Sequence, residues 1–316
     1  MRKLVSLATL ALVVSLAHPA AAAPSAGEVR NFGPELSATC NLPEGVAVDP
    51  QGNVYASSLN FNATSGSANI CVLDRSGALV DVISVAPVPG GVTKLLGMLF
   101  VPDEGLYVGD IGGGRVLRID VTTHAATTIA TGFGAPNAFE RDHAGNIFVS
   151  DSFPGTVTKI APDGATTTFA YPVQLAPHGE SPPFGANGLA FDRNERYLYV
   201  AETSRDEIYR IAYADGALGA IELFARGSGT GALDGADGIA FDVRGNLYVC
   251  SNQSDEIAVL SPGGDVIAEY RGTGGNAFNS PASIAFNGRT VYVANLALFH
   301  GGPNKVSVFT APYPGS

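Results

Sequence analysis

Oxygen-bearing side chains recur at one position of a motif that is repeated along the chain. The clearest copies of the motif read PEGVAVD, PNAFERD, ANGLAFD and ADGIAFD. At the second residue of the motif the six copies carry Glu44, Leu96, Asn137, Asn187, Asp237 and Ala282. Carboxylate and carboxamide oxygens, without a thiol or an imidazole, favour a hard cation, and Ca²⁺ accepts about six to eight such ligands in irregular geometry.

Each copy of the motif predicts the start of a four-stranded unit. An apolar strand, a turn and a second apolar strand are followed by another strand pair that alternates apolar and polar residues. The copies align at Gly45, Gly97, Ala138, Gly188, Gly238 and Ser283, with separations of 52, 41, 50, 50 and 45 residues. Four strands in every interval of about 40–50 residues are typical of a β-propeller. We therefore predict an all-β, six-bladed β-propeller of four-stranded blades.

Other features of the sequence agree with this fold. Alternating βαβ units would need amphipathic helical stretches, and none follows the N-terminal segment. The absence of Trp excludes a typical WD40 array. Four carboxylates that open the hairpin turns are interpreted as structural, namely Asp49, Asp142, Asp192 and Asp242.

The propeller explains why the repeated oxygen donors can do chemistry together. The innermost strand of each blade lines the central channel, so the first residue of each inner strand points toward the axis at one mouth. Glu44, Asn137, Asn187 and Asp237 then converge, and we predict that they bind a metal at the central channel. Any one of these residues could instead be a turn former, but four at equivalent positions favour the metal site.

Composition excludes several functional classes. The chain has 316 residues, 18 Lys and Arg against 29 Asp and Glu, and a formal net charge of −11. This charge argues against a nucleic-acid partner, and no apolar stretch is long enough for a membrane span. With 39 Gly and 20 Pro, the chain is expected to be rich in turns.

The first residues predict export. Arg2 and Lys3 precede an apolar run, and small residues follow, which is the pattern of a signal peptide over residues 1–23. We expect a periplasmic or extracellular, monomeric protein, with residues 24–41 leading into a single propeller domain over residues 42–316. In an oxidising compartment the three cysteines allow three pairings. Cys40 with Cys71 is the pairing we expect, and Cys250 is expected to be a buried thiol.

On these motifs the sequence resembles the regucalcin (senescence marker protein)/gluconolactonase group of calcium-dependent six-bladed propellers, with relatives among diisopropyl fluorophosphatases and paraoxonases. Glu44, Asn187 and Asp237 match the metal-binding residues of that group, and Asn137 matches an additional Asn that binds the metal or contacts substrate. The resemblance implies Ca²⁺ as cofactor, with Zn²⁺, Mn²⁺ or Mg²⁺ accepted by relatives. A second, structural calcium is not expected, because Gly45 and Ala138 stand where paraoxonases have acidic residues.

The predicted function is hydrolysis of a small lactone or related ester at the metal. Asp237 is the predicted general base, and its direct attack on substrate is an open variant. Predicted substrate-binding residues near the same mouth are Asp151, His178, Asn252, Asn295 and His300. The alternative is a non-catalytic propeller module of the NHL type, with a structural ion and a partner-binding rim.

Overall fold

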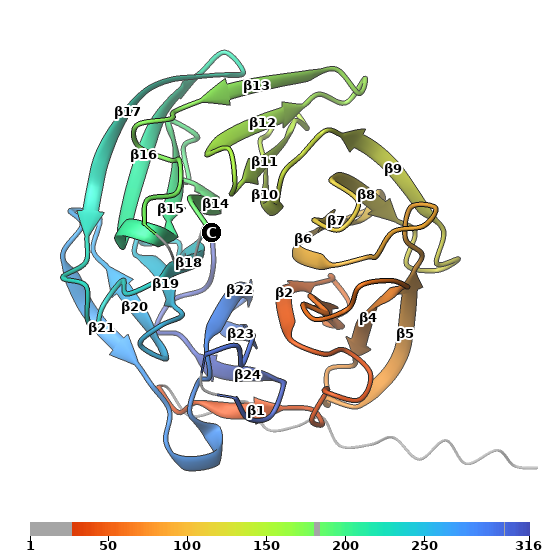
Figure 1. Cartoon of the computed structure of the whole chain (residues 1–316). Helices are drawn as coiled ribbons and strands as arrows, with labels where there is room; N and C mark the ends of the chain where they lie inside the picture. The colour runs from red at the N-terminus through yellow and green to blue at the C-terminus, as the bar shows by residue number, and fades with distance from the viewer. Residues whose placement is uncertain (1–26, 180–183, 300) are drawn as a thin grey trace, which may run out of the picture.

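The computed structural model describes residues 27–179, 184–299 and 301–316. The predicted signal peptide and His300 lie outside the described residues. Strands are arranged in six antiparallel four-stranded sheets around a central axis (Figure 1). The predicted six-bladed β-propeller is confirmed.

In the first five blades the chain runs from the axis outward, and in the sixth blade β22, β23 and β24 do so while β1 supplies the outermost strand. The inner strands are β2 (Pro43–Val48), β6 (Leu95–Val101), β10 (Pro136–Arg141), β14 (Ala186–Phe191), β18 (Ala236–Phe241) and β22 (Pro281–Asn287). The second strands are β3 (Val54–Ser58), β7 (Gly105–Asp110), β11 (Ile147–Asp151), β15 (Tyr197–Glu202), β19 (Leu247–Ser251) and β23 (Thr290–Asn295). The third strands are β4 (Ala68–Leu73), β8 (Arg115–Ile119), β12 (Thr156–Ile160), β16 (Glu207–Ala214), β20 (Glu256–Leu260) and β24 (Lys305–Thr310). The outermost strands are β5 (Leu79–Val85), β9 (Ala126–Thr131), β13 (Thr166–Ala170), β17 (Ala217–Arg226), β21 (Val266–Tyr270) and β1 (Arg30–Phe32). Two short 3₁₀ helices are η1 (Thr203–Arg205) and η2 (Gly274–Asn276).

The last blade is built from both ends of the chain. β1 pairs antiparallel with β24, with Arg30 opposite Val308 and Phe32 opposite Val306. Residues 24–41, predicted as a segment leading into the propeller, thus include the outermost strand of the sixth blade. This pairing closes the circle, because the first strand completes the sheet that the final strands begin (Figure 1).

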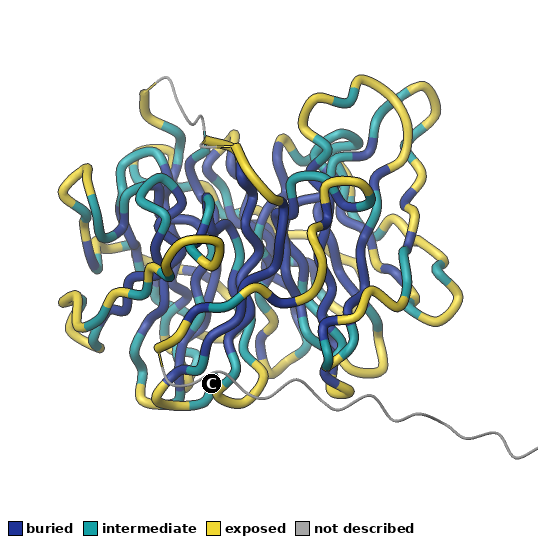
Figure 2. The backbone as a smooth tube through the Cα atoms, turned by 90° about the horizontal axis from the view of Figure 1, so that it is seen from below, coloured by how far each residue is buried: buried dark blue, intermediate teal, exposed yellow. Residues whose placement is uncertain are grey.

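Apolar side chains are buried between neighbouring blades. One cluster joins Ile70 and Ile83 of the first blade to Leu106 and Ile119 of the second. All four side chains are fully buried, and each contributes about 1.5–3 kcal/mol to folding. Figure 2 shows the same pattern, with buried strands inside and exposed turns at the top, bottom and outer edge.

Other predicted elements have the expected structure. The hairpin carboxylates bind their own turns, as Asp49 Oδ1 does by accepting a hydrogen bond of 2.8 Å from the amide of Asn53. Cys40 and Cys71 form a disulfide, and Cys250 is a buried free thiol, both as predicted. Among the described residues, no helix has the length and apolar character that crossing a bilayer requires.

The end of the chain lies at the axis, at the mouth where the inner strands end (Figure 1). The amide of Ser316 donates to the carbonyl oxygen of Phe241 at 3.0 Å, and Gly315 forms a bridge with Asp242. The oxygen donors predicted from the repeats lie at the opposite mouth, where the inner strands begin.

Candidate metal centre

A β-bulge at the start of every inner strand turns one side chain toward the axis. In β2, Pro43 is opposite Ser58 and Val46 is opposite Ala56, so the inner strand has one extra residue. The other five inner strands have the same irregularity at their first residues. Because a bulge changes the direction of the side chains within it, residues such as Glu44 leave the alternation of the sheet.

The glycines after these residues allow neighbouring blades to approach closely. A Cβ atom on Gly188 would lie 2.2 Å from the carbonyl oxygen of Asp237, and one on Gly238 would lie 2.6 Å from that of Ala282. Both distances are far below van der Waals contact, so only a hydrogen atom fits. The backbones of adjacent inner strands are therefore held at a fixed separation around the axis.

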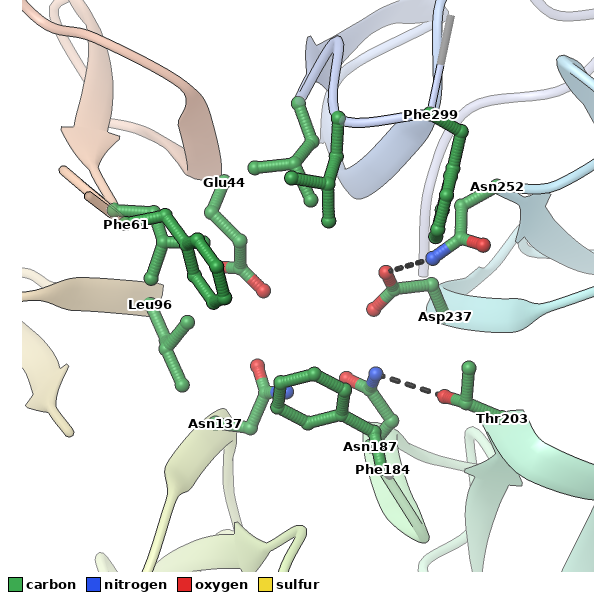
Figure 3. Close-up of a pocket in the computed structure, with 13 residues that line it drawn as sticks. Glu44, Phe61, Leu96, Asn137, Phe184, Asn187, Thr203, Asp237, Asn252 and Phe299 are labelled. Atoms are coloured by element: carbon green, nitrogen blue, oxygen red, sulfur yellow. Dashed lines mark hydrogen bonds between the residues drawn. The ribbon is translucent and has the colours of Figure 1, made fainter. Parts of the chain in front are cut away.

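The four predicted oxygen donors face one pocket. Glu44, Asn137, Asn187 and Asp237 come from four different blades, and each is only 3–4% exposed. Figure 3 shows their carboxyl and carboxamide groups around a common space. The pocket, including its open mouth, has a volume of about 450 Å³.

Hydroxyl groups behind the ring fix the orientation of two carboxamides. Thr203 Oγ1 donates its single proton to the carbonyl oxygen of Ala236 at 2.7 Å, so it can only accept from Asn187 Nδ2, at 2.9 Å. Asn187 therefore turns its oxygen toward the pocket. Ser152 does the same for Asn137, by donating to the carbonyl oxygen of Ala186 at 2.6 Å and accepting from Asn137 Nδ2 at 3.1 Å.

The two carboxylates of the ring lack a compensating positive charge. Burial raises the pKa of Glu44 well above its usual range, and repulsion by Asp237 raises it further. Burial also raises the pKa of Asp237, to about 7, although a hydrogen bond of 2.8 Å from Asn252 Nδ2 to its Oδ2 acts in the opposite direction. None of the described residues that line the pocket is Lys, Arg or His.

The donor set fits a hard cation. Glu44 Oε2 is buried without a hydrogen-bond partner, although such an atom is costly to leave unpaired. A divalent cation would neutralise both carboxylates and occupy the space that the oxygens face. Among the described residues, no three His, Cys, Asp or Glu side chains are placed together so that they could hold a metal ion. The ring would therefore rely on carboxamide oxygens from Asn137 and Asn187 for half of its donors.

Other predicted site residues have different surroundings. Asn252 lines the pocket beside Asp237. Asp151 does not line this pocket, and it accepts hydrogen bonds from the amides of Gly134 and Ala135, which precede the inner strand β10 of the same blade.

Two further candidates are not brought to the ring. Asn295 is fully buried and hydrogen-bonds the amide of Asn279 and the hydroxyl of Ser307. His178 is exposed, and its ring contacts Arg205 and the carbonyl oxygen of Ala176. Neither residue lines the pocket.

Sequence reasoning missed the hydroxyls of Ser152 and Thr203 and most of the apolar pocket wall. Both hydroxyl residues directly follow the second strand of their blade. Comparison of this position between repeats would have identified them, since the fifth blade carries Asn252 there and the other three carry apolar residues.

Fold and site together define a six-bladed propeller with a buried, acidic, oxygen-rich ring at one mouth of its channel. A family model described as "SMP-30/Gluconolactonase/LRE-like region" matches residues 180–296, which include Asn187 and Asp237. The resemblance predicted from the repeats is confirmed by this match and by the relatives that follow.

Three relatives illustrate the likeness. A gluconolactonase from Zymomonas mobilis is 23% identical over 300 residues, which are 85% of this chain and 83% of that protein. The structure of a gluconolactonase from Xanthomonas campestris has a TM-score of 0.66 at 20% identity. The matched region covers 95% of this chain and 99% of that protein's chain. A calcium-binding protein, regucalcin, from Agrobacterium tumefaciens has a TM-score of 0.65 at 16% identity, with coverage of 90% and 95%. At these identities the solved structures show the fold alone.

Proposed function

We propose that the protein is an exported, metal-dependent hydrolase that acts on a lactone or a related ester. The observation that carries the proposal is the buried pair of carboxylates, Glu44 and Asp237, beside two carboxamide oxygens that their hydroxyl partners turn toward the same space. The gluconolactonases among the relatives supply the reaction class. The disulfide between Cys40 and Cys71 supports a periplasmic or extracellular location.

Glu44, Asn137, Asn187 and Asp237 would hold the cation, and Ca²⁺ is the proposed ion. When bound, such an ion supplies a Lewis acid that polarises an ester carbonyl and stabilises the negative charge developing on its oxygen. The buried pocket excludes most bulk water from these groups. Substrate would enter this pocket from the mouth of the channel at which the inner strands begin.

Asp237 is proposed as the general base. Asn252 Nδ2 donates a hydrogen bond of 2.8 Å to Asp237 Oδ2 and so orients the carboxylate. Asp237 Oδ1 is left to accept a proton. Water would add to the carbonyl carbon while its proton passes to Asp237. The bond from the carbonyl carbon to the ester oxygen then breaks, and the leaving alkoxide takes up that proton.

The test is hydrolysis before and after removal of the metal. Purified protein is treated with a chelator and assayed on glucono-δ-lactone, an aryl ester and a homoserine lactone, with Ca²⁺, Zn²⁺, Mn²⁺ or Mg²⁺ added back. Turnover that disappears with the chelator and returns with Ca²⁺ supports the proposal. A rise in melting temperature with Ca²⁺ but no turnover of any ester or lactone would overturn it and favour the binding module.

The two roles considered for Asp237 differ in where the water oxygen goes. A single turnover in ¹⁸O-labelled water places the label in the product if Asp237 is a base. Label found in the Asp237 carboxylate by mass spectrometry would instead identify it as the nucleophile.

A further inference from the structure

Two sets of aligned positions around the ring divide the blades into a polar half and an apolar half, and Phe184 also lines the pocket on the polar side. Three consecutive blades, the third to the fifth, carry polar residues at the ring position and directly after the second strand. These residues are Asn137, Asn187 and Asp237, and Ser152, Thr203 and Asn252. At the same two positions the sixth, first and second blades carry Ala282, Glu44 and Leu96, and Leu296, Leu59 and Ile111. Glu44 is the one oxygen donor in the apolar half.

The apolar half is a packed wall. Leu59, Leu96, Ala282 and Leu296 form one buried cluster, with exposed fractions of 1–6%. Three of them, Leu59, Leu96 and Leu296, line the pocket beside the ring. A ligand that fills the pocket therefore contacts hydrocarbon along this side.

Apolar side chains continue from this wall to the rim. Phe61, Leu298 and Phe299 line the pocket and are 49%, 36% and 40% exposed (Figure 3). Lys94 stabilises the Phe61 segment, because its Nζ donates to the carbonyl oxygen of Phe61 at 2.8 Å and lies 5.5 Å from the ring centroid. Binding of an apolar ligand over these exposed side chains is favourable, because it removes apolar surface from water.

In the polar half, part of the hydrogen-bonding capacity is already used within the protein, and the ring oxygens face the proposed cation. Thr203 Oγ1 both donates and accepts within the protein. Asn137, Asn187 and Asn252 each already donate a side-chain N–H to a neighbouring oxygen. A sugar lactone would bury several hydroxyls against the leucine wall, where each unpaired group costs about 1–3 kcal/mol.

We propose that the substrate is a lactone or ester that carries an apolar alkyl or aryl group and not a polyhydroxylated sugar lactone. This inference rests on the proposed function for the reaction, and on the lining of the pocket for the substrate class. The carbonyl group faces Asn137, Asn187 and Asp237, while the apolar group lies against Leu96, Leu296 and the rim.

Lactams test the substrate class separately from catalysis, because they have the shape of lactones and resist hydrolysis. Binding of δ-valerolactam, of derivatives with alkyl chains of increasing length, and of glucono-δ-lactam is measured by calorimetry with Ca²⁺ present. Affinity should rise about fourfold for each of the first methylenes added. Glucono-δ-lactam should bind more weakly than the pentyl derivative. Affinity that does not depend on chain length, or tighter binding of glucono-δ-lactam, would overturn the inference.

Two pocket variants locate the apolar contact. Phe61→Ala and Leu298→Ala should each weaken binding of the pentyl lactam about fivefold, with little change for δ-valerolactam. Leu223→Ala is the matched control, since Leu223 is 44% exposed on β17, the outermost strand of its blade. Equal affinity of wild type and both pocket variants for the pentyl lactam would contradict the proposed placement.

Hydrolysis of the matching alkyl lactones is scored separately. Alkyl lactams that bind with the expected gradient, together with lactones that are never hydrolysed, would refute the proposed function and leave the ligand class standing. Hydrolysis of lactones without any preference for the alkyl group would support the proposed function and refute the inferred substrate class.

Discussion

At the scale of single residues, the main feature of the site is a pair of buried carboxylates, with no Lys, Arg or His among the described residues that line their pocket. Glu44 and Asp237 are each 4% exposed, and burial raises the pKa of both. Natural proteins rarely leave such charges unpaired. The proposed cation would compensate this energetic cost.

Asp237→Asn separates the chemical role of this residue from its structural role. If Asp237 is the base, metal-dependent hydrolysis should fall by about 10²- to 10⁴-fold. The melting temperature of the metal-free protein should stay the same or rise, because one of two buried like charges is removed. Hydrolysis rates and thermal unfolding of the chelator-treated protein provide the measurements. Turnover close to that of wild type would disprove the base assignment.

Thr203 supplies a second residue-scale prediction through its effect on Asn187. Thr203→Val keeps the shape of the side chain but removes the hydroxyl that accepts from Asn187 Nδ2 and donates to the carbonyl oxygen of Ala236. Calcium affinity should fall about 10- to 100-fold, because the carboxamide is no longer oriented. Calorimetric titration with Ca²⁺ measures the change.

Thr203→Ser is the matched control for that experiment. It retains the hydroxyl, so its calcium affinity should stay near that of wild type. A loss in Thr203→Ser as large as in Thr203→Val would indicate a packing effect and not an orienting hydrogen bond.

At the scale of elements, the inner strands position the ring through a bulge and a close contact. The bulge turns the ring residue toward the axis, and the following glycine brings the next inner strand near. In β14 and β18 these two features link Asn187 to Asp237 through the backbone. A change in one strand should therefore affect the donor on its neighbour.

Gly188→Ala tests this link. Its new Cβ would lie 2.2 Å from the carbonyl oxygen of Asp237, so β14 and β18 must separate. We expect a loss of about 1–3 kcal/mol in the free energy of unfolding, together with weaker calcium binding. Chemical denaturation and calcium titration are the measurements. Gly275→Ala, where no atom lies within 4 Å of the new Cβ, should change neither quantity.

Much of this arrangement could be predicted from the sequence, because each inner strand is marked by its own copy of the motif. The position of Glu44, Asn137, Asn187 and Asp237 at one mouth follows from the repeat alone. The hydrogen bonds of Ser152 and Thr203 could not be predicted in the same way. Each hydroxyl accepts from the inner strand of its own blade and donates to the carbonyl of the next one, and only the packed structure brings these groups together.

The pairing of β1 with β24 was also beyond prediction. β1 has only three residues, Arg30 to Phe32, and carries no copy of the motif. Its partner strand lies about 275 residues further along the chain, from Lys305 to Thr310. Local sequence patterns do not predict a pairing between strands so far apart in the chain.

At the scale of the whole molecule, the two mouths of the channel differ in their ionisable groups. The mouth opposite the ring is lined by the last residues of the inner strands and by Ser316. Glu140 lies there at the end of β10, and its surroundings include Arg141, His143, Asp192, Arg193 and Glu195. Desolvation by burial raises the pKa of Glu140 to about 7. Backbone hydrogen bonds from Arg141 and Phe191 oppose this rise, and repulsion by Glu195 adds to it.

This shift predicts how stability depends on pH. The folded protein holds a proton on Glu140 more tightly than the unfolded chain, whose carboxyl has a pKa near 4.5. The contribution of Glu140 is therefore most favourable below about pH 4.5 and is lost as the pH rises toward 7. Glu140→Gln should be more stable than wild type at pH 8, with a smaller loss of stability between pH 5 and pH 8. Melting temperatures across this range measure it, and parallel curves for both proteins would contradict the assignment.

The pairing of β1 with β24 also affects the order in which the blades can be completed during synthesis. β1 is among the first described strands to be synthesised, whereas β24 is the last. The sixth blade therefore cannot form its outermost pairing until Lys305–Thr310 has been synthesised. During synthesis five blades can pack before β24 is available, so we expect β1 to pair after these blades have formed. A chain that stops before Lys305 would lack the strand that β1 needs.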